Sequence, residues 1–260
     1  MRNPWERPET PLFYESFCDT HDRYRRANEV LIRNARLSTD LRRVLDVGAG
    51  TGRTAEIALG RLGPEVRVIC VEPSIAMRRS GRARLSDPRV RWQAALPLRT
   101  GSFDRILCGA AIWQMSPLSE TVRLLARLLR NGGALSFNIP GLYLQEADLP
   151  GGGDDPHLIA LPARLFQPPT GVTISNREPL TAQLVEEALR SAGLRATRWS
   201  HRIRLTQEAY AEWLKIPVLT EYRRSGLSPE KRARRIDAAM ENLDRNSWRW
   251  ESWRGWTAWK

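Results

Sequence analysis

The sequence predicts an α/β fold built on one doubly wound sheet, and three observations support this. From residue 42 to residue 139, apolar segments of strand length alternate with segments of helical periodicity. The first strand segment runs directly into a glycine-rich turn and a helix, VLDVGAGTGR at residues 44–53. With 260 residues, 42% of them hydrophobic, the chain can form one packed domain with insertions. We therefore expect a single domain, residues 1–260, with a mostly parallel, seven-stranded, Rossmann-like sheet.

The elements follow one another in a regular order. Residues 1–40 are expected to form a helical cover, because Val30, Leu31, Asn34 and Leu37 recur at helical spacing. The core, residues 41–140, should contain five strands, at residues 42–47, 66–72, 89–93, 103–111 and 133–139. Helices are expected between them at residues 53–60, 74–81 and 118–130. We expect Ser116 and Pro117 to open the last of these helices, and Asn131-Gly132 to end it.

Two insertions should complete the domain, at residues 141–180 and 203–245. The first is turn-rich, and we expect it to cover the carboxyl edge of the sheet, where such folds bind ligands. Thr181 should cap a helix that Gly193 ends. A strand at residues 194–204 and helices at residues 206–215 and 228–242 follow.

The C-terminal segment holds five of the ten tryptophans in its last 13 residues. Trp253, Gly255, Thr257 and Trp259 alternate as they would in a strand, with Trp256 on the opposite face. We therefore expect an antiparallel final strand whose tryptophans serve packing rather than a ligand cage.

Composition narrows the class of protein. The net charge is +12, but the 38 arginines are scattered along the chain, so charge alone gives little support for a nucleic-acid partner. An acidic substrate, or one on an acidic carrier, remains open. The three cysteines form no CxxC pair, and no apolar run reaches the ~18–20 residues that span a bilayer. With no apolar leader at the start, we expect a cytoplasmic protein that is not bound to membranes.

The glycine turn indicates the kind of ligand. A dinucleotide site favours G-x-G-x-x-G, whereas Gly48, Gly50 and Gly52 form G-x-G-x-G. Asp46, in the preceding strand, would repel a pyrophosphate but would stabilise a ligand with an α-amino group and a sulfonium. Glu72, at the end of the second strand, can accept hydrogen bonds from both ribose hydroxyls of either ligand type. The ligand is therefore expected to be cationic at the Asp46 end.

Four segments in this order, VLDVGAGTGR, VEPSIAM, LPLRTGSFD and LLRNGGALSF, resemble the class I S-adenosylmethionine (SAM)-dependent methyltransferases. The resemblance covers about residues 40–140 and is closest to the small-molecule (type 11) branch. It implies SAM as the cofactor, with the methionine part surrounded by Asp46, Gly48, Gly50 and Gly52. It also implies that Glu72 holds the ribose and that Pro73 and Met77 flank the adenine.

Three departures from the family pattern are informative. RWQAALPL lacks the usual acidic residue before LPL, so Gln93 or the backbone must bind the adenine amino group. Ile112-Trp113 stands where many relatives have His-Trp, so that histidine base is missing. The N-P-P-Y type motif of base-amino methyltransferases is absent from CGAAIWQMSP, which disfavours a nucleic-acid substrate.

Methyl transfer mainly requires alignment of the acceptor and exclusion of water, with a base only if the acceptor must lose a proton. The sequence shows no paired carboxylates, metal-ligand cluster or nucleophile triad, and His21, His157 and His201 are isolated.

Two residues are the catalytic candidates. Tyr14, like Tyr24 in the helical cover, can hold a sulfonium by cation–π attraction, although helix packing explains a tyrosine there equally well. Asn138 can orient an amine or a carboxylate at the end of the fifth strand, where turn chemistry is the alternative. An aromatic acceptor pocket is expected from Tyr143, Trp199, Tyr210 and Trp213. Trp113 should lie just past the fourth strand, on the ligand-binding edge of the sheet.

The preferred function is therefore a SAM-dependent methyltransferase of a small molecule in secondary metabolism. The alternative is a cyclase that consumes SAM itself to form azetidine-2-carboxylate and methylthioadenosine. An RNA methyltransferase and a non-enzymatic SAM sensor are less favoured. Neither the acceptor nor the oligomeric state can be predicted from this sequence.

Overall fold

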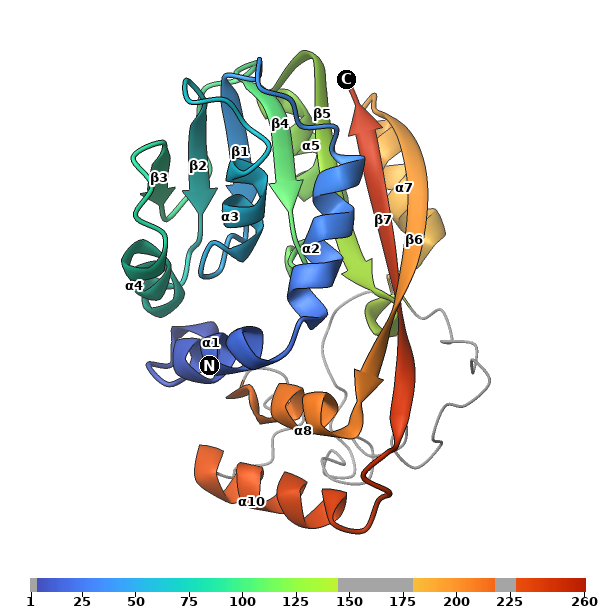
Figure 1. The fold of residues 1–260 in the computed structure, drawn as a ribbon. Helices are drawn as coiled ribbons and strands as arrows, with labels where there is room; N and C mark the ends of the chain where they lie inside the picture. The colour runs from blue at the N-terminus through green and yellow to red at the C-terminus, as the bar shows by residue number, and fades with distance from the viewer. Residues whose placement is uncertain (1–3, 145–179, 218–227) are drawn as a thin grey trace.

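The computed structural model describes residues 4–144, 180–217 and 228–260, and its centre is one seven-stranded sheet (Figure 1). The strand order is β3-β2-β1-β4-β5-β7-β6. All neighbours from β3 to β5 are parallel, whereas β7 runs antiparallel to both β5 and β6. The strands are β1 (Arg43–Val47), β2 (Arg67–Val71), β3 (Val90–Gln93), β4 (Phe103–Cys108), β5 (Leu129–Pro140), β6 (Arg195–Thr206) and β7 (Trp248–Trp259). The predicted fold class is confirmed.

Helices cover both faces of this sheet. On one face, α2 (Arg23–Asn34) packs against α3 (Arg53–Leu59), and on the other α5 (Leu118–Leu128) packs against α7 (Ala182–Ser191) (Figure 1). The strands between these layers are apolar, and every residue of β4 is buried. Cys70 and Cys108 lie in this core as small apolar side chains, and both are free thiols.

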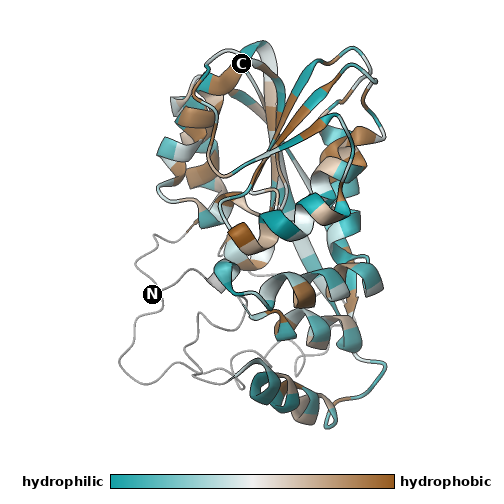
Figure 2. Cartoon of the chain, turned by 90° about the vertical axis from the view of Figure 1, so that its left-hand side faces the viewer, coloured by the Kyte–Doolittle hydropathy of each residue, from teal (hydrophilic) through white to brown (hydrophobic). Residues whose placement is uncertain are grey.

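A second group of helices lies at the carboxyl ends of the parallel strands. It consists of η1 (Pro4–Glu6), α1 (Thr10–Thr20), α8 (Gln207–Lys215) and α10 (Pro229–Met240). Phe17 of α1 is buried in one apolar cluster with residues of α8 and α10, so the N-terminal and C-terminal parts of the chain meet here. Figure 1 shows α1 and α8 below the strand ends, with α10 farther out. In Figure 2 the central strands are largely hydrophobic, whereas α10 is mostly hydrophilic.

The last two strands extend beyond the rest of the sheet. β5 pairs with β7 from Ala134 opposite Trp259 to Pro140 opposite Trp253. β6 stays paired with β7 farther, to Thr206 opposite Trp248. This two-stranded extension carries α8 at its end. Trp253 and Trp256 are fully buried, and Trp256 stacks on Phe137 at 5.4 Å, as expected for packing residues.

Two helix boundaries differ from those predicted. The second core helix, α4 (Ile75–Arg84), continues past Gly81 because that glycine serves packing: a Cβ there would lie 2.3 Å from Trp92 Cη2. The helix α5 begins after Pro117 without a side-chain cap from Ser116. It ends at Leu128 because Leu129 already pairs with Phe103 as the first residue of β5. The predicted cap Thr181 is present and accepts from the Leu184 N–H, and Ser74 caps α4 by accepting from the Met77 N–H.

The insertion expected at residues 141–180 lies, apart from residues 141–144 and 180, outside the described residues, and His157 lies outside with it. Across the described ranges, no helix has the length and apolar character needed to cross a membrane.

Candidate functional site

The glycine turn after β1 adopts a backbone that other residues rarely accept. Gly48, Gly50 and Gly52 have φ angles of +66°, +56° and +84°. A Cβ on Gly48 would lie 2.6 Å from the Ala111 Cβ, so the turn approaches the segment after β4 very closely. Gly52 is also the N-cap of α3. The Gly48 and Ala49 N–H groups donate to the Val71 carbonyl, so the turn is held at the carboxyl end of β2.

Asp46 lies in β1, two residues before this turn, and it is completely buried. Within the described parts of the chain, neither of its carboxylate oxygens has a hydrogen-bond partner. Burial raises the pKa of Asp46 to about 7, with a smaller contribution from the charge of Glu72. The Ala55 N–H faces the carboxylate and lowers the pKa in part, without hydrogen-bond geometry. A buried acceptor without a partner fits a ligand that brings a positive charge and N–H donors.

Glu72 ends β2 and links the turn to α4. Its two oxygens accept from the Gly50 N–H at 2.9 Å and from the Ser74 N–H at 2.8 Å. Burial raises the pKa of Glu72, and these backbone donors oppose the rise. Each oxygen keeps a second lone pair, so two ribose hydroxyls can still donate to this carboxylate.

The predicted adenine contacts lie around the same residue. Met77 is buried with its methyl group near Gly50, and the Gln93 carbonyl accepts from the Glu72 N–H at 3.0 Å. Pro73 is exposed between Glu72 and the N-cap Ser74. The structure therefore brings together the predicted cofactor residues Asp46, Gly48, Gly50, Gly52, Glu72, Pro73, Met77 and Gln93.

The N-terminal segment is fastened over this region by polar contacts. The Trp5 carbonyl accepts from Ser74 Oγ at 2.7 Å, and Trp5 Nε1 donates to Gln114 Oε1 at 2.7 Å. Gln114 belongs to η2 (Ile112–Gln114), which follows β4. Glu6 accepts from the Ile75 N–H at 3.1 Å. Thus η1 bridges the start of α4 and the segment after β4.

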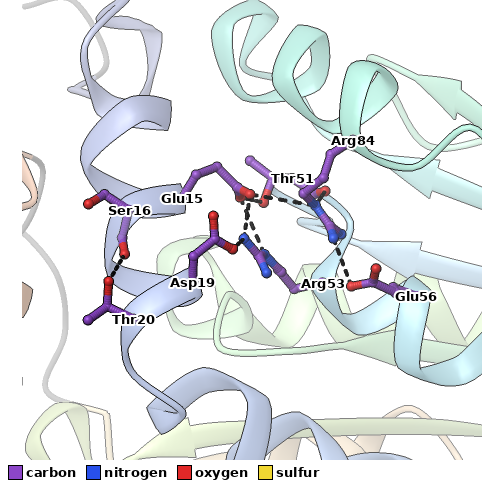
Figure 3. A network of polar contacts seen from close by, with 8 residues as sticks. All are labelled: Glu15, Ser16, Asp19, Thr20, Thr51, Arg53, Glu56 and Arg84. Atoms are coloured by element: carbon purple, nitrogen blue, oxygen red, sulfur yellow. Dashed lines mark hydrogen bonds and ion pairs between the residues drawn. The ribbon is translucent and has the colours of Figure 1, made fainter.

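A charged network fastens α1 to the glycine turn (Figure 3). Glu15 accepts from the Thr51 hydroxyl, which belongs to the turn, and from the Arg53 guanidinium at the start of α3. Arg84 of α4 pairs with the same carboxylate at 3.6 Å. Sequence reasoning did not identify Glu15, because an acidic residue in an amphipathic helix carries no local signal of such a partner.

The two predicted catalytic residues lie in different surroundings. Burial raises the pKa of Tyr14 well above its ordinary value, so the phenol stays protonated at neutral pH. Its ring lies 5.5 Å from Tyr24 and 6.3 Å from Trp5. Asn138 is fully buried at the end of β5, where it accepts from the Ala110 N–H and donates to the Ala27 carbonyl. Both groups of this amide are therefore used to hold α2 and the segment after β4.

The predicted aromatic pocket residues, considered together with Trp113, form three separate groups. Trp113 stacks on Tyr143 at 4.6 Å, and Tyr210 stacks on Trp213 at 5.7 Å. Trp199 lies instead against Gly255, where a Cβ would come within 2.1 Å of its ring. Among the described residues, no group of three or more His, Cys, Asp or Glu could hold a metal ion.

Comparison with known proteins agrees with this geometry. Residues 45–137 match the family model of a methyltransferase domain. This part of the chain is therefore similar to known methyltransferase domains. The match confirms the resemblance of the sequence motifs and supports SAM as the cofactor of the domain.

Curated relatives of this methyltransferase domain match over part of their length. A malonyl-[acyl-carrier protein] O-methyltransferase of Paenibacillus sp. is 29% identical over 132 residues, which cover 46% of this chain and 47% of the relative. A ubiquinone biosynthesis O-methyltransferase of Xanthomonas oryzae pv. oryzae is 35% identical over 107 residues, 39% of this chain and 44% of the relative. The chain thus spans less than half of the curated relatives it matches.

Solved structures share the fold at low sequence identity. The YcgJ protein of Bacillus subtilis has a TM-score of 0.58 at 17% identity, covering 91% of this chain and 99% of that protein. The [4+2]-cyclase SpnF has a TM-score of 0.56 at 20% identity, and the similarity covers 90% of this chain and 80% of that protein. At these identities the similarity describes the fold alone.

Proposed function

We propose that the protein is a SAM-dependent methyltransferase that acts on a small molecule, with secondary metabolism as the setting. The observation that carries this proposal is the buried carboxylate of Asp46, which has no partner beside the glycine turn. An α-ammonium group would supply the missing donors and the opposite charge. The backbone of the turn would hold the rest of the methionine part, and Glu72 the ribose hydroxyls.

Bound SAM would supply an electrophilic methyl group with a good leaving group. The residues of the chain then have to align the acceptor and exclude water. The contacts of Trp5 and Glu15 fasten η1 and α1 over the turn, which serves exclusion of water. Asn138 is proposed as a positioning residue, because its amide fixes Ala110 and α2 relative to one another.

Tyr14 is proposed to contact the reacting groups rather than to remove a proton. Burial keeps its phenol protonated at neutral pH, so its ring face is the part that can stabilise a positively charged sulfur. Because relatives include O-methyltransferases and a C-methyltransferase, oxygen and carbon are the acceptor atoms to test first.

A product assay tests the proposal and separates it from the alternatives. The protein is incubated with methyl-labelled SAM, first alone and then with fractionated small-molecule extracts, and the products are analysed by mass spectrometry. We expect adenosylhomocysteine and a labelled product only when an acceptor fraction is present. Methylthioadenosine formed without acceptor would instead establish SAM as the substrate. Label transferred to RNA would contradict the small-molecule assignment.

A matched pair of variants makes this assay specific for the site. Asp46→Asn should lose turnover because the ammonium partner is gone. Asp87→Asn changes an aspartate that pairs with the neighbouring Arg89 near the surface, and it should leave turnover unchanged. Equal activity in both variants would contradict the role of Asp46.

A further inference from the structure

A buried ion pair joins the start of α2 to the extended part of β7. Arg23, in the first turn of α2, donates through Nε to Glu251 Oε2 at 2.7 Å and through Nη2 to Oε1. Glu251 lies in the extended part of β7, and both side chains are almost fully buried, at 1% and 6% exposure. Trp253 Nε1 also donates to this carboxylate, at 2.8 Å. Glu251 therefore neutralises Arg23 completely.

The third nitrogen of the guanidinium, Nη1, is buried and makes no hydrogen bond among the described residues. The guanidinium carbon lies 4.6 Å, 4.5 Å and 5.2 Å from the ring centres of Tyr24, Trp213 and Trp253. These rings favour the cation, but they do not replace a directional acceptor for its N–H groups. An unsatisfied donor of this kind indicates a partner that the described residues do not supply.

A series of packing contacts connects Arg23 to the glycine turn. Tyr24 packs in one apolar cluster with Ala27, Trp253 and Ala110. Ala110 precedes Ala111, the residue against which Gly48 packs. Tyr24 also lies 5.5 Å from Tyr14 in the cover. Arg23 is thus linked to the glycine turn through Tyr24 and then through Ala110.

The charge balance around Arg23 selects the kind of ligand. Because Glu251 already cancels its charge, a carboxylate ligand would place a second negative charge beside Glu251 in dry surroundings. His201, whose ring stacks on Trp253 at 5.9 Å, cannot compensate, because burial lowers its pKa to about 4. A neutral oxygen avoids this cost, and the aromatic rings around the guanidinium favour a planar ligand.

We propose that Arg23 Nη1 donates to a neutral oxygen, a carbonyl or an ether, on a planar aromatic methyl acceptor. Arg23 is then a specificity-determining residue, and Glu251 sets the preference for uncharged acceptors. This inference rests on the proposed function, since it names the class of molecule that the same site takes.

Three probes of similar shape test the proposal: acetophenone with a neutral carbonyl, benzoate with a carboxylate, and toluene with no oxygen. Their dissociation constants are measured by ligand-observed NMR on the protein saturated with adenosylhomocysteine. We expect acetophenone to bind about tenfold more tightly than either other probe, the difference that about 1.4 kcal/mol confers. A preference for benzoate, no preference, or no binding of any probe to the wild type would overturn the inference.

Variants separate recognition from a purely structural role. Arg23→Lys keeps the charge beside Glu251 but removes the second arm of the guanidinium, so the acetophenone preference should disappear. Glu251→Gln leaves the positive charge of Arg23 unbalanced, so the variant should bind benzoate more tightly than acetophenone. Loss of structure would weaken the binding of both probes and could not reverse the preference. Arg26→Lys, on the same helix in an exposed pair with Asp22, should leave the preference unchanged. Wild-type preference in both Arg23→Lys and Glu251→Gln would refute the role.

The dissociation constant of adenosylhomocysteine is measured first, because it distinguishes failure of the proposed function from failure of the inference about Arg23. If adenosylhomocysteine binds but the probes show no preference, only the inference about Arg23 fails. If it does not bind, the proposed function fails, and the probes are then tested on the protein without it.

Discussion

Asp46→Asn should make the protein more stable at alkaline pH while it weakens the binding of a cationic cofactor. The wild-type carboxylate is fully buried and has no hydrogen-bond partner, so the folded protein must hold an ionised group in an unfavourable place. Asparagine has nearly the same shape and carries no charge. The substitution therefore removes the unfavourable free energy of holding an ionised carboxylate in this buried site.

The size of this effect follows from the pKa of Asp46, about 7 in the folded protein against an ordinary 3.8. Between these values the folded state holds a proton that the unfolded state has lost. The free energy of unfolding therefore falls as pH rises from about 4 to about 7 and stays low above that. The total difference is on the order of 4 kcal/mol, of which about 2–3 kcal/mol lies between pH 5 and pH 8.

Urea denaturation of wild type and Asp46→Asn at pH 5, 6, 7 and 8 measures this difference directly. From pH 5 to pH 8, the free energy of unfolding of the variant should rise by about 2–3 kcal/mol relative to that of the wild type. The reason is that the wild type loses stability as Asp46 ionises, whereas the cost of burying the amide does not change with pH. Asp87→Asn is the control, since Arg89 lowers the pKa of Asp87 and its contribution is lost only as pH falls. Parallel stability curves for wild type and Asp46→Asn would refute the reasoning.

Three further substitutions probe the backbone and the cover. Gly48→Ala places a Cβ 2.6 Å from the Ala111 Cβ at a positive φ, so denaturation should show a loss of about 1–3 kcal/mol; an unchanged midpoint would contradict the geometry. Glu15→Gln should speed dissociation of adenosylhomocysteine in stopped-flow measurements, and equal rates would argue against a fastened α1. Gly255→Ala should lower stability by about 1–3 kcal/mol, and Trp199→Ala in the same chain should restore part of the loss.

The core of the fold can be predicted from the sequence because its determinants are local. The apolar runs of β1, β2 and β4 and the spacing of Gly48, Gly50 and Gly52 can each be recognised within a short segment of sequence. The cofactor residues follow from the same segments, since the ends of adjacent parallel strands must meet at one edge of the sheet.

Other features could not be predicted because they depend on contacts between distant parts of the chain. Arg23 and Glu251 are 228 residues apart, and nothing near either residue indicates the pair. Gly81 has the sequence pattern of a helix end, but contact with Trp92 explains it. Asn138 has the pattern of turn chemistry, whereas its amide joins two elements that only the folded sheet brings together.

Proton release on binding of adenosylhomocysteine tests most directly whether Asp46 holds the cationic end of the cofactor. Calorimetric titrations at pH 6.5, in buffers with different enthalpies of ionisation, give the number of protons released. With a pKa of about 7 in the free protein, the wild type should release about 0.7 proton as the ammonium draws Asp46 into its charged form, and Asp46→Asn none. Tight binding with the same proton count in both proteins would contradict this account.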